Sequence, residues 1–158
     1  MQDSVLDPLH QPGLGILAAA VRRRLKQVIS ARLAVHGITL QQFWVILVLG
    51  ESGGTSLHPL AQRVWMDDPT ASRVVKSLVE RGLVTTQPDP HHGRRIIISL
   101  DPEAQPLARE LQGLAAEVRA GLVRGLGEDQ QALLRQGLRH MIANLDGMLV
   151  GPAPVASA

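Results

Sequence analysis

The sequence predicts a mostly α fold that carries one small β-hairpin. Apolar residues recur three and four positions apart along six stretches, and this spacing places them on one face of a helix. Two β-rich runs, LVTTQ and RIIISL, flank a turn-forming segment with Pro, Asp and Gly. Glycines, prolines and capping residues separate the stretches, as expected at helix ends. The 158 residues correspond to one domain of ordinary size or to two closely joined lobes.

The first long helix is expected from about Gly13 to His36. Its apolar positions are Leu14, Leu17, Val21, Leu25, Val28, Ile29 and Leu33. Residues 1–12 are polar and contain two prolines, which favours an arm with little structure of its own. Gly37 is expected to end the helix, and Thr39 to cap a second, very apolar helix, LQQFWVILVL, that must be buried on most sides. The loop ESGGT follows it.

Two short helices joined by a tight turn are predicted between residues 57 and 82. The apolar faces consist of Leu57, Leu60, Ala61 and Val64 in the first helix and of Ala71, Val74, Val75, Leu78 and Val79 in the second. Trp65, Met66 and Asp67 leave room for only a tight turn between them. Asp68 is predicted to cap the second helix, with Pro69 at its first position, and Gly82 to end it. This is the spacing of a helix-turn-helix.

Two further long helices are expected after the hairpin. A cap-and-proline pair, DP, starts the first of them at residue 101, although Pro106 must disturb its first turn, so the regular helix is expected to begin near Pro106. Its apolar spacing continues to Leu126. The last helix is predicted from Glu128 to Met148.

Three long helices therefore carry apolar stripes at the two ends of the chain, beyond what a small core requires. Such stripes indicate a partner, and because soluble oligomers are mostly two-fold dimers, we expect a homodimer formed through these helices. A helical bundle folded back on its own chain is the alternative.

The second short helix leaves polar groups outside its apolar face. These are Thr70, Ser72, Arg73, Lys76 and Ser77. Such groups reach phosphates and base edges when a helix N-terminus enters the major groove of DNA, where Arg grips guanine with two hydrogen bonds. An ordinary solvated face is the alternative. The hairpin tip favours DNA, since it forms a basic finger suited to a minor groove, made of His91, His92, Gly93, Arg94 and Arg95.

These segments resemble the MarR family of winged helix-turn-helix regulators over nearly the whole chain. The signature is LAQRVWMDDPTASRVVKSLVERGLV followed by DPHHGRRIIISL. The resemblance implies a recognition helix that begins at Asp67 or Asp68, with Arg73 as its frequent basic residue and Arg94 as the wing arginine in the minor groove. Two residues depart from the family pattern. His92 stands where Asp is usual, and Trp65 where a small or polar residue is usual.

The resemblance also implies a site for a small aromatic carboxylate or phenolic effector, where the first, second and fifth helices meet. Matching residues are present: Phe43 and Trp44 as aromatic wall, Gln41 and Gln42 as hydrogen-bonding groups, and Arg24 as a cation for a carboxylate. In the alternative interpretation the two aromatic residues are ordinary core and Arg24 is a solvated charge.

Composition excludes several other classes of protein. The absence of cysteine excludes disulfides, thiolate metal sites and thiol-based sensing. No long apolar run and no signal peptide is present, so we expect a cytoplasmic protein without membrane contact. The six histidines show no metal-ligand spacing, and no catalytic set or phosphate-binding loop is recognisable, so we expect neither an enzyme nor a cofactor.

The net charge is only +2, but the positive excess lies in residues 1–36 and 57–100, where a DNA contact needs it.

The sequence is thus interpreted as a winged helix-turn-helix protein with long terminal dimerisation helices, which binds operator DNA and regulates transcription, most commonly as a repressor. Its expected parts are residues 1–36 (arm and dimerisation helix), 37–100 (DNA-binding lobe), 101–150 (dimerisation helices) and 151–158 (disordered tail). A small cytoplasmic ligand-binding protein or enzyme that uses the helical lobe, and a structural protein that coats DNA without sequence preference, are the alternatives.

Overall fold

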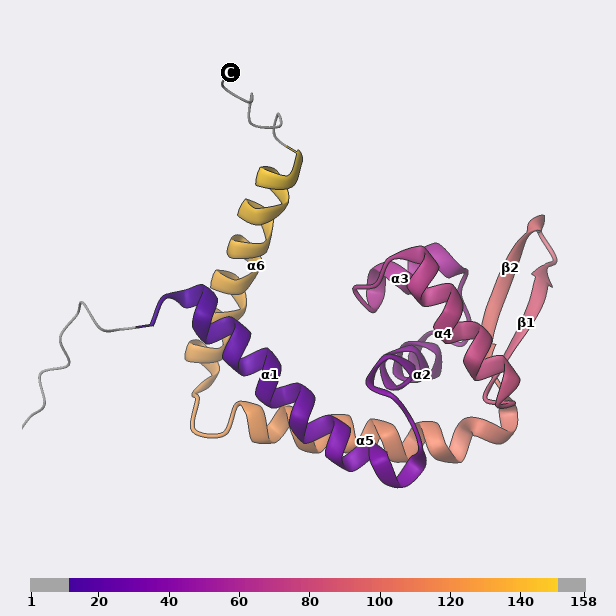
Figure 1. Cartoon of the computed structure of the whole chain (residues 1–158), viewed down its shortest axis with the longest axis horizontal. Coiled ribbons are helices and arrows are strands. Elements are labelled where there is room, and N and C mark those ends of the chain that lie inside the picture. The colour runs from indigo at the N-terminus through magenta and orange to yellow at the C-terminus, as the bar shows by residue number, and fades with distance from the viewer. Residues whose placement is uncertain (1–11, 151–158) are drawn as a thin grey trace, which may run out of the picture. The chain divides into compact units, whose positions relative to one another are not determined.

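The computed structural model describes residues 12–150, which form six α-helices, two 3-10 turns and one two-stranded sheet (Figure 1). The helices are α1 (Leu14–Leu33), α2 (Leu40–Ser52), α3 (Leu57–Arg63), α4 (Asp68–Glu80), α5 (Gln105–Leu122) and α6 (Glu128–Val150). The strands are β1 (Val84–Asp89) and β2 (His92–Leu100), and the 3-10 turns are η2 (Ala34–His36) and η3 (Pro102–Ala104). The mostly α fold with one hairpin is confirmed. The expectations for residues 1–11 and for the tail 151–158 lie outside the described part.

The chain divides into two compact units, Met1–Val118 and Arg119–Ala158. The first unit contains one hydrophobic core, which joins the C-terminal end of α1, nearly all of α2, the helix-turn-helix, the hairpin and the start of α5. Its fully buried large side chains include Ile29, Leu33, Phe43, Ile46, Leu60, Leu78 and Leu111. Within residues 12–150 no single helix is long and apolar enough to cross a membrane, and only Leu14–His36 and Leu40–Ser52 taken together, across a bend of 81°, meet that test.

The first α-helix ends at Leu33, three residues before the predicted end at His36, and the 3-10 turn η2 fills this interval, whereas Gly37 and Thr39 act as predicted. Gly37 adopts a left-handed conformation with φ of 60°, which glycine reaches at little cost. Thr39 then forms a capping box with Gln42: the Gln42 amide donates to Thr39 Oγ1, and Gln42 Oε1 accepts from the Thr39 amide. The helix runs to Ser52, so the expected loop ESGGT begins only after its first two residues, at Gly53.

The helix-turn-helix consists of α3 and α4, and one detail of its prediction is wrong. Asp67, and not Asp68, caps α4, because Asp67 Oδ1 accepts a hydrogen bond from the Thr70 amide at 2.6 Å. Pro69 is therefore the second helical residue. Gly82, with φ of 68°, ends the helix as predicted.

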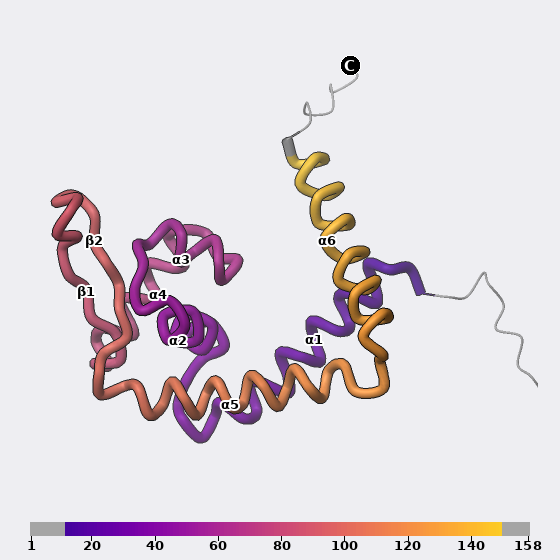
Figure 2. The backbone as a smooth tube through the Cα atoms, turned by 180° about the vertical axis from the view of Figure 1, so that it is seen from behind, coloured from indigo at the N-terminus to yellow at the C-terminus, as the bar shows by residue number. Residues whose placement is uncertain are grey.

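The hairpin pairs Val84 with Leu100 at its base and continues through regular antiparallel pairs to Pro88 and Ile96. A register shift between Pro88 and Asp89 lets the tip diverge from the regular ladder. At its base Thr55 exchanges backbone hydrogen bonds with Ile98, which ties the hairpin to the segment before α3. Both backbone views show the hairpin beside the end of α4 (Figures 1 and 2).

The C-terminal helices agree with the prediction at three of their four ends. Asp101 caps the 3-10 turn η3, and the regular helix α5 starts at Gln105, next to Pro106. However, α5 ends at Leu122 and not at Leu126, because the chain turns through Gly125 with φ of 86°. The last helix, α6, begins at Glu128 as predicted and ends at Val150, two residues beyond Met148.

Candidate nucleic-acid interface

Helix α4 separates an apolar face from a polar face. Ala71, Val74, Val75 and Leu78 are buried in the core. Ser72, Arg73 and Lys76 are exposed, and Thr70 is half-buried. Three of the predicted DNA-contacting residues therefore share an accessible face of the helix. Lys76 lies 4.0 Å from Glu80 in a pair whose two side chains are mostly exposed, so it remains able to exchange this partner for a phosphate.

Arg73 and Asp67 both make hydrogen bonds with the first turn of α4. Arg73 Nη2 donates to Thr70 Oγ1 at 3.1 Å and its Nε donates to the Pro69 carbonyl at 3.4 Å, so the guanidinium lies along the N-terminal turn of its own helix. Hydrogen bonds from the Thr70 side chain and amide, and secondarily the charge of Arg73, hold the pKa of Asp67 below its usual value. Asp67 is therefore a charged cap that orders the start of the helix, and this contribution is lost as the pH falls through its lowered pKa.

Ser77 does not belong to the polar face, which corrects the sequence interpretation. Its Oγ accepts a hydrogen bond from Gln42 Nε2 at 2.6 Å, and its side chain is half-buried against α2. Gln42 is also unsuited to the predicted role in effector binding, because both ends of its side-chain amide already have partners. Its Nε2 donates to Ser77, and its Oε1 accepts from the Thr39 amide and from Arg81 Nη1. Arg81 also donates to the Gly37 carbonyl at 2.8 Å. These residues fasten the end of α4 to α2.

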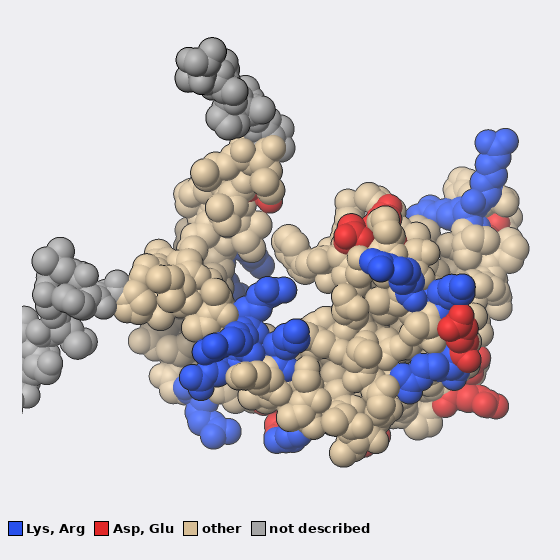
Figure 3. All heavy atoms as spheres, in the orientation of Figure 1, with Lys and Arg blue, Asp and Glu red and all other residues tan. Residues whose placement is uncertain are grey.

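The hairpin tip exposes the predicted basic finger. His91, His92 and Arg94 are exposed on the turn and on the start of β2. Asp89 Oδ1 accepts from the His91 amide at 2.9 Å and so shapes the turn. Arg95 is also exposed, but its Nη2 donates to Ser56 Oγ at 2.9 Å, which holds it against the segment before α3. Figure 3 shows Lys and Arg atoms at this tip and over α4, and a further group over α1. The exposed cations of α1 include Arg22, Arg23, Arg24 and Lys26.

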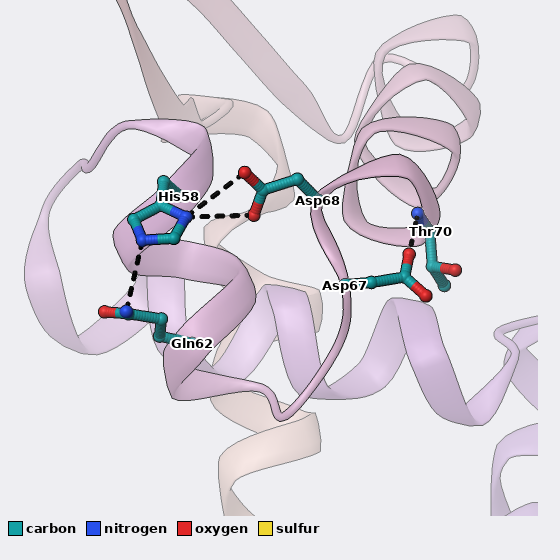
Figure 4. A network of polar contacts seen from close by, with 5 residues as sticks. All are labelled: His58, Gln62, Asp67, Asp68 and Thr70. Atoms are coloured by element: carbon teal, nitrogen blue, oxygen red, sulfur yellow. Dashed lines mark hydrogen bonds and ion pairs between the residues drawn. The ribbon is translucent and has the colours of Figure 1, made fainter. Parts of the chain in front are cut away.

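A polar network that is not apparent from the sequence links α3 to α4 (Figure 4). His58 Nδ1 lies 3.1 Å from both carboxylate oxygens of Asp68, and Gln62 Nε2 lies 3.1 Å from His58 Nε2. A neutral imidazole protonated at Nδ1 satisfies both contacts, because it donates to Asp68 and accepts from Gln62. The spacing of His58 and Gln62, four apart on a helix, was the available signal. The contact of His58 with Asp68 could not be predicted from spacing, because it depends on how α3 packs against α4.

The residues predicted to bind an effector differ in their exposure. Arg24 and Gln41 are exposed, and Trp44 is half-buried with its ring centroid 4.9 Å from that of Phe43. Phe43 is completely buried in the core and offers no accessible surface within this chain. Among residues 12–150 no group of three or more His, Asp or Glu side chains is arranged to hold a metal ion.

The arrangement of α2, the helix-turn-helix and the hairpin matches known DNA-binding regulators. A sequence model of the MarR family matches residues 36–95. The crystal structure of the transcriptional regulator PA3341 is 30% identical, superposes with a TM-score of 0.77, and covers 85% of this chain and 99% of its own. This chain belongs to the MarR family. It is a DNA-binding transcriptional regulator with a winged-helix fold.

Two other relatives of this MarR-family chain extend the comparison. An HTH-type transcriptional repressor of Mycobacterium tuberculosis, Rv2887, is 25% identical over 81% of this chain and 92% of its own length. The structure of Bordetella bronchiseptica BpsR, described with a mechanism for regulation of its DNA binding by 6-hydroxynicotinic acid, is 23% identical, covers 84% of this chain and 94% of its own, and has a TM-score of 0.73.

Proposed function

We propose that this MarR-family protein is a homodimeric repressor that binds a pseudo-palindromic operator and releases it when a small aromatic carboxylate or phenol binds. The observation that supports operator binding best is the exposed polar face of α4 beside the basic hairpin tip. In this proposal Ser72, Arg73 and Lys76 enter a major groove and Arg94 enters the adjacent minor groove. Thr70 and Asp67 order the helix start, and His91, His92 and Arg95 flank the wing contact.

The apolar surface of the terminal helices supports assembly of a dimer. In α6 the side chains of Leu134, Leu138, Ile142 and Leu145 are exposed, as are Leu14, Leu17 and Val21 in α1. Large exposed apolar surfaces of this kind mark protein contacts. A two-fold dimer repeats the recognition helix once per half-site, so a palindromic operator gains two equivalent contacts. Residues 37–100 would then bind DNA, while α1, α5 and α6 hold the two copies together.

The effector proposal rests on Arg24, Gln41 and Trp44. Arg24 supplies a cation and Gln41 an amide on accessible surfaces, and Trp44 supplies part of an aromatic wall. The neighbour BpsR responds to 6-hydroxynicotinic acid, an aromatic acid, which supports this chemical class. For release, the acid must bind the DNA-incompetent state more tightly than the competent one, since equal affinity shifts nothing.

A mobility-shift titration tests operator binding. The full chain is titrated onto the promoter region beside its own gene and onto a shuffled duplex of equal length at one fixed salt concentration. We expect binding to the promoter at least about a thousandfold tighter, as specific regulators show. Equal affinity for the two duplexes would contradict sequence-specific regulation and would favour non-specific DNA coating.

A calorimetric titration tests the effector site. Small aromatic acids are first screened for release of the promoter duplex, and those that release it are titrated into wild type, Arg24→Ala and, as a control on the same exposed run, Arg22→Ala. We expect Arg24→Ala to weaken acid binding by about tenfold or more and Arg22→Ala to leave it unchanged, since a charge-assisted hydrogen bond to a carboxylate is lost only in the first. Equal affinity in all three proteins would remove Arg24 from the site, and failure of every acid to release DNA would remove the site itself.

A further inference from the structure

Trp65, in the turn between α3 and α4, stands at a backbone position that favours glycine, and its side chain is exposed. Its φ is 55°, in the left-handed region, and it is the one non-glycine residue with a positive φ among residues 12–150. Its side chain is nevertheless 81% exposed. A left-handed φ costs free energy for any residue with a Cβ atom, and a side chain left in water recovers none of that cost through burial. Strained residues of this kind concentrate at functional sites.

The surrounding contacts hold this turn in place. The Trp65 amide donates to the Gln62 carbonyl at 3.2 Å, and the Met66 amide donates to the Ala61 carbonyl at 2.9 Å. On the far side of the turn, His58 of α3 contacts Asp68 of α4 (Figure 4). The two backbone bonds form a Schellman motif that ends α3, which sets the left-handed φ of Trp65 and fixes the direction of its Cα–Cβ bond relative to the recognition helix.

We propose that Trp65 contacts the operator backbone beside the N-terminal end of the recognition helix. It lies two residues before the helix cap Asp67. When a helix-turn-helix docks, the first helix crosses the DNA backbone and the N-terminal residues of the second approach base edges, so the turn that joins them lies near the edge of the groove. An indole has an N–H for a phosphate oxygen and an apolar face for a deoxyribose, and both are backbone contacts. The proposal rests on the DNA-binding function of the family.

The indole of Trp65 is a neutral group among charged residues that already have partners. The two carboxylates that follow Trp65 are engaged within the lobe, Asp67 as the cap of α4 and Asp68 with His58. The nearest cation on α4, Arg73, lies over Thr70. Because the indole carries no charge, it can bind a phosphate without neutralising it, and the contact should strengthen binding without releasing a counterion.

Tryptophan fluorescence tests the contact directly, because the chain has only two tryptophans, Trp44 and Trp65. Acrylamide quenching is measured on wild type, on Trp44→Phe and on Trp65→Phe, each free and saturated with operator duplex. The fluorescence of Trp65 is obtained from Trp44→Phe, and as a check from the difference between wild type and Trp65→Phe. We expect this fluorescence to be quenched readily in the free protein and to be shielded from acrylamide in the complex. Trp44 should not change. A Trp65 that stays equally accessible in the complex overturns the proposal.

Affinity and stability separate a DNA contact from a structural role. Trp65→Gly relieves the left-handed strain, so its thermal midpoint should stay the same or rise, while operator affinity falls about five- to tenfold through loss of one hydrogen bond and its apolar contact. The slope of log Kd against log salt should not change, whereas the loss of a cation that binds a phosphate would reduce it.

Unchanged affinity, or a fall in affinity accompanied by an equal loss of stability, overturns the proposal. Shielding that grows with protein concentration without DNA also overturns it, since it assigns Trp65 to a contact between copies. Parallel mobility shifts of wild type distinguish these outcomes from a failure of operator binding itself.

Discussion

Arg73 lies on the accessible face of α4, with its guanidinium held over the first helical turn by Thr70 and Pro69. These contacts order the side chain before DNA arrives, so little conformational freedom remains to be lost on binding. We expect Arg73→Ala to weaken operator binding by about 1–3 kcal/mol, the range for a bidentate contact to a base, and to relax sequence preference at one position of each half-site. Mobility shifts at fixed salt against operators with single base changes measure both effects.

Arg63→Ala is the matched control for this prediction. Arg63 lies on α3, where it pairs with Glu51 at 3.3 Å on the surface. Its removal is expected to change operator affinity and discrimination much less. If Arg73→Ala is folded and binds the operator as wild type does, Arg73 does not read a base.

The two arginines of the wing should behave differently although they are adjacent. Arg94 is exposed at the start of β2, whereas Arg95 is held by Ser56 at 2.9 Å. We expect Arg94→Ala to reduce the slope of log Kd against log salt by about 1, because one phosphate neutralisation is lost, with little effect on sequence choice. Arg95→Ala should change the slope less. Equal slopes for Arg94→Ala and wild type would show that Arg94 does not bind a phosphate.

At the scale of elements, the connection between α2 and the end of α4 depends on one buried amide. Gln42 is 6% exposed and contacts Thr39, Ser77 and Arg81. We expect Gln42→Ala to lower the free energy of unfolding by about 1–3 kcal/mol, since it leaves buried donors and acceptors without partners. Gln41→Ala, at the exposed neighbouring position, should change it by less than about 0.5 kcal/mol. Urea unfolding followed by circular dichroism makes the comparison, and equal stability of the two variants would contradict a structural role for Gln42.

Most element boundaries could be predicted because local chemistry determines them. Gly37 and Gly82 end helices by adopting positive φ, and Thr39 caps α2 through its own hydroxyl. The cap of α4 was predicted wrongly because two adjacent residues offered competing local solutions. Asp67 and Asp68 can each cap a helix, and only packing against His58 of α3 assigns Asp68 a different role.

The predictions for the candidate site had the same limit. Periodicity correctly placed Ser72, Arg73 and Lys76 on the accessible face of α4. It placed Ser77 there as well, because its neighbour Gln42 lies 35 positions away in the sequence and on another helix. The contact of Arg95 with Ser56, 39 positions apart, was equally invisible. Spacing thus gives the face of a helix, whereas the partner of a polar residue requires the tertiary packing.

For the whole molecule, the open question is what covers the apolar face of α6. Leu138 and Ile142 are 42% and 39% exposed, one turn apart on this helix. In a dimer formed through the terminal helices, a glutamate at either position would bury an unpaired charge at a cost of several kcal/mol. We therefore expect Leu138→Glu and Ile142→Glu to be monomeric by light scattering and to lose operator affinity steeply, because a monomer contacts only one half-site.

Gln136→Glu adds the same charge at an exposed polar position of α6 and should leave the dimer intact. Circular dichroism establishes that each variant is folded, and a folded, dimeric Leu138→Glu and Ile142→Glu pair with wild-type operator affinity would place the dimer contact on another surface.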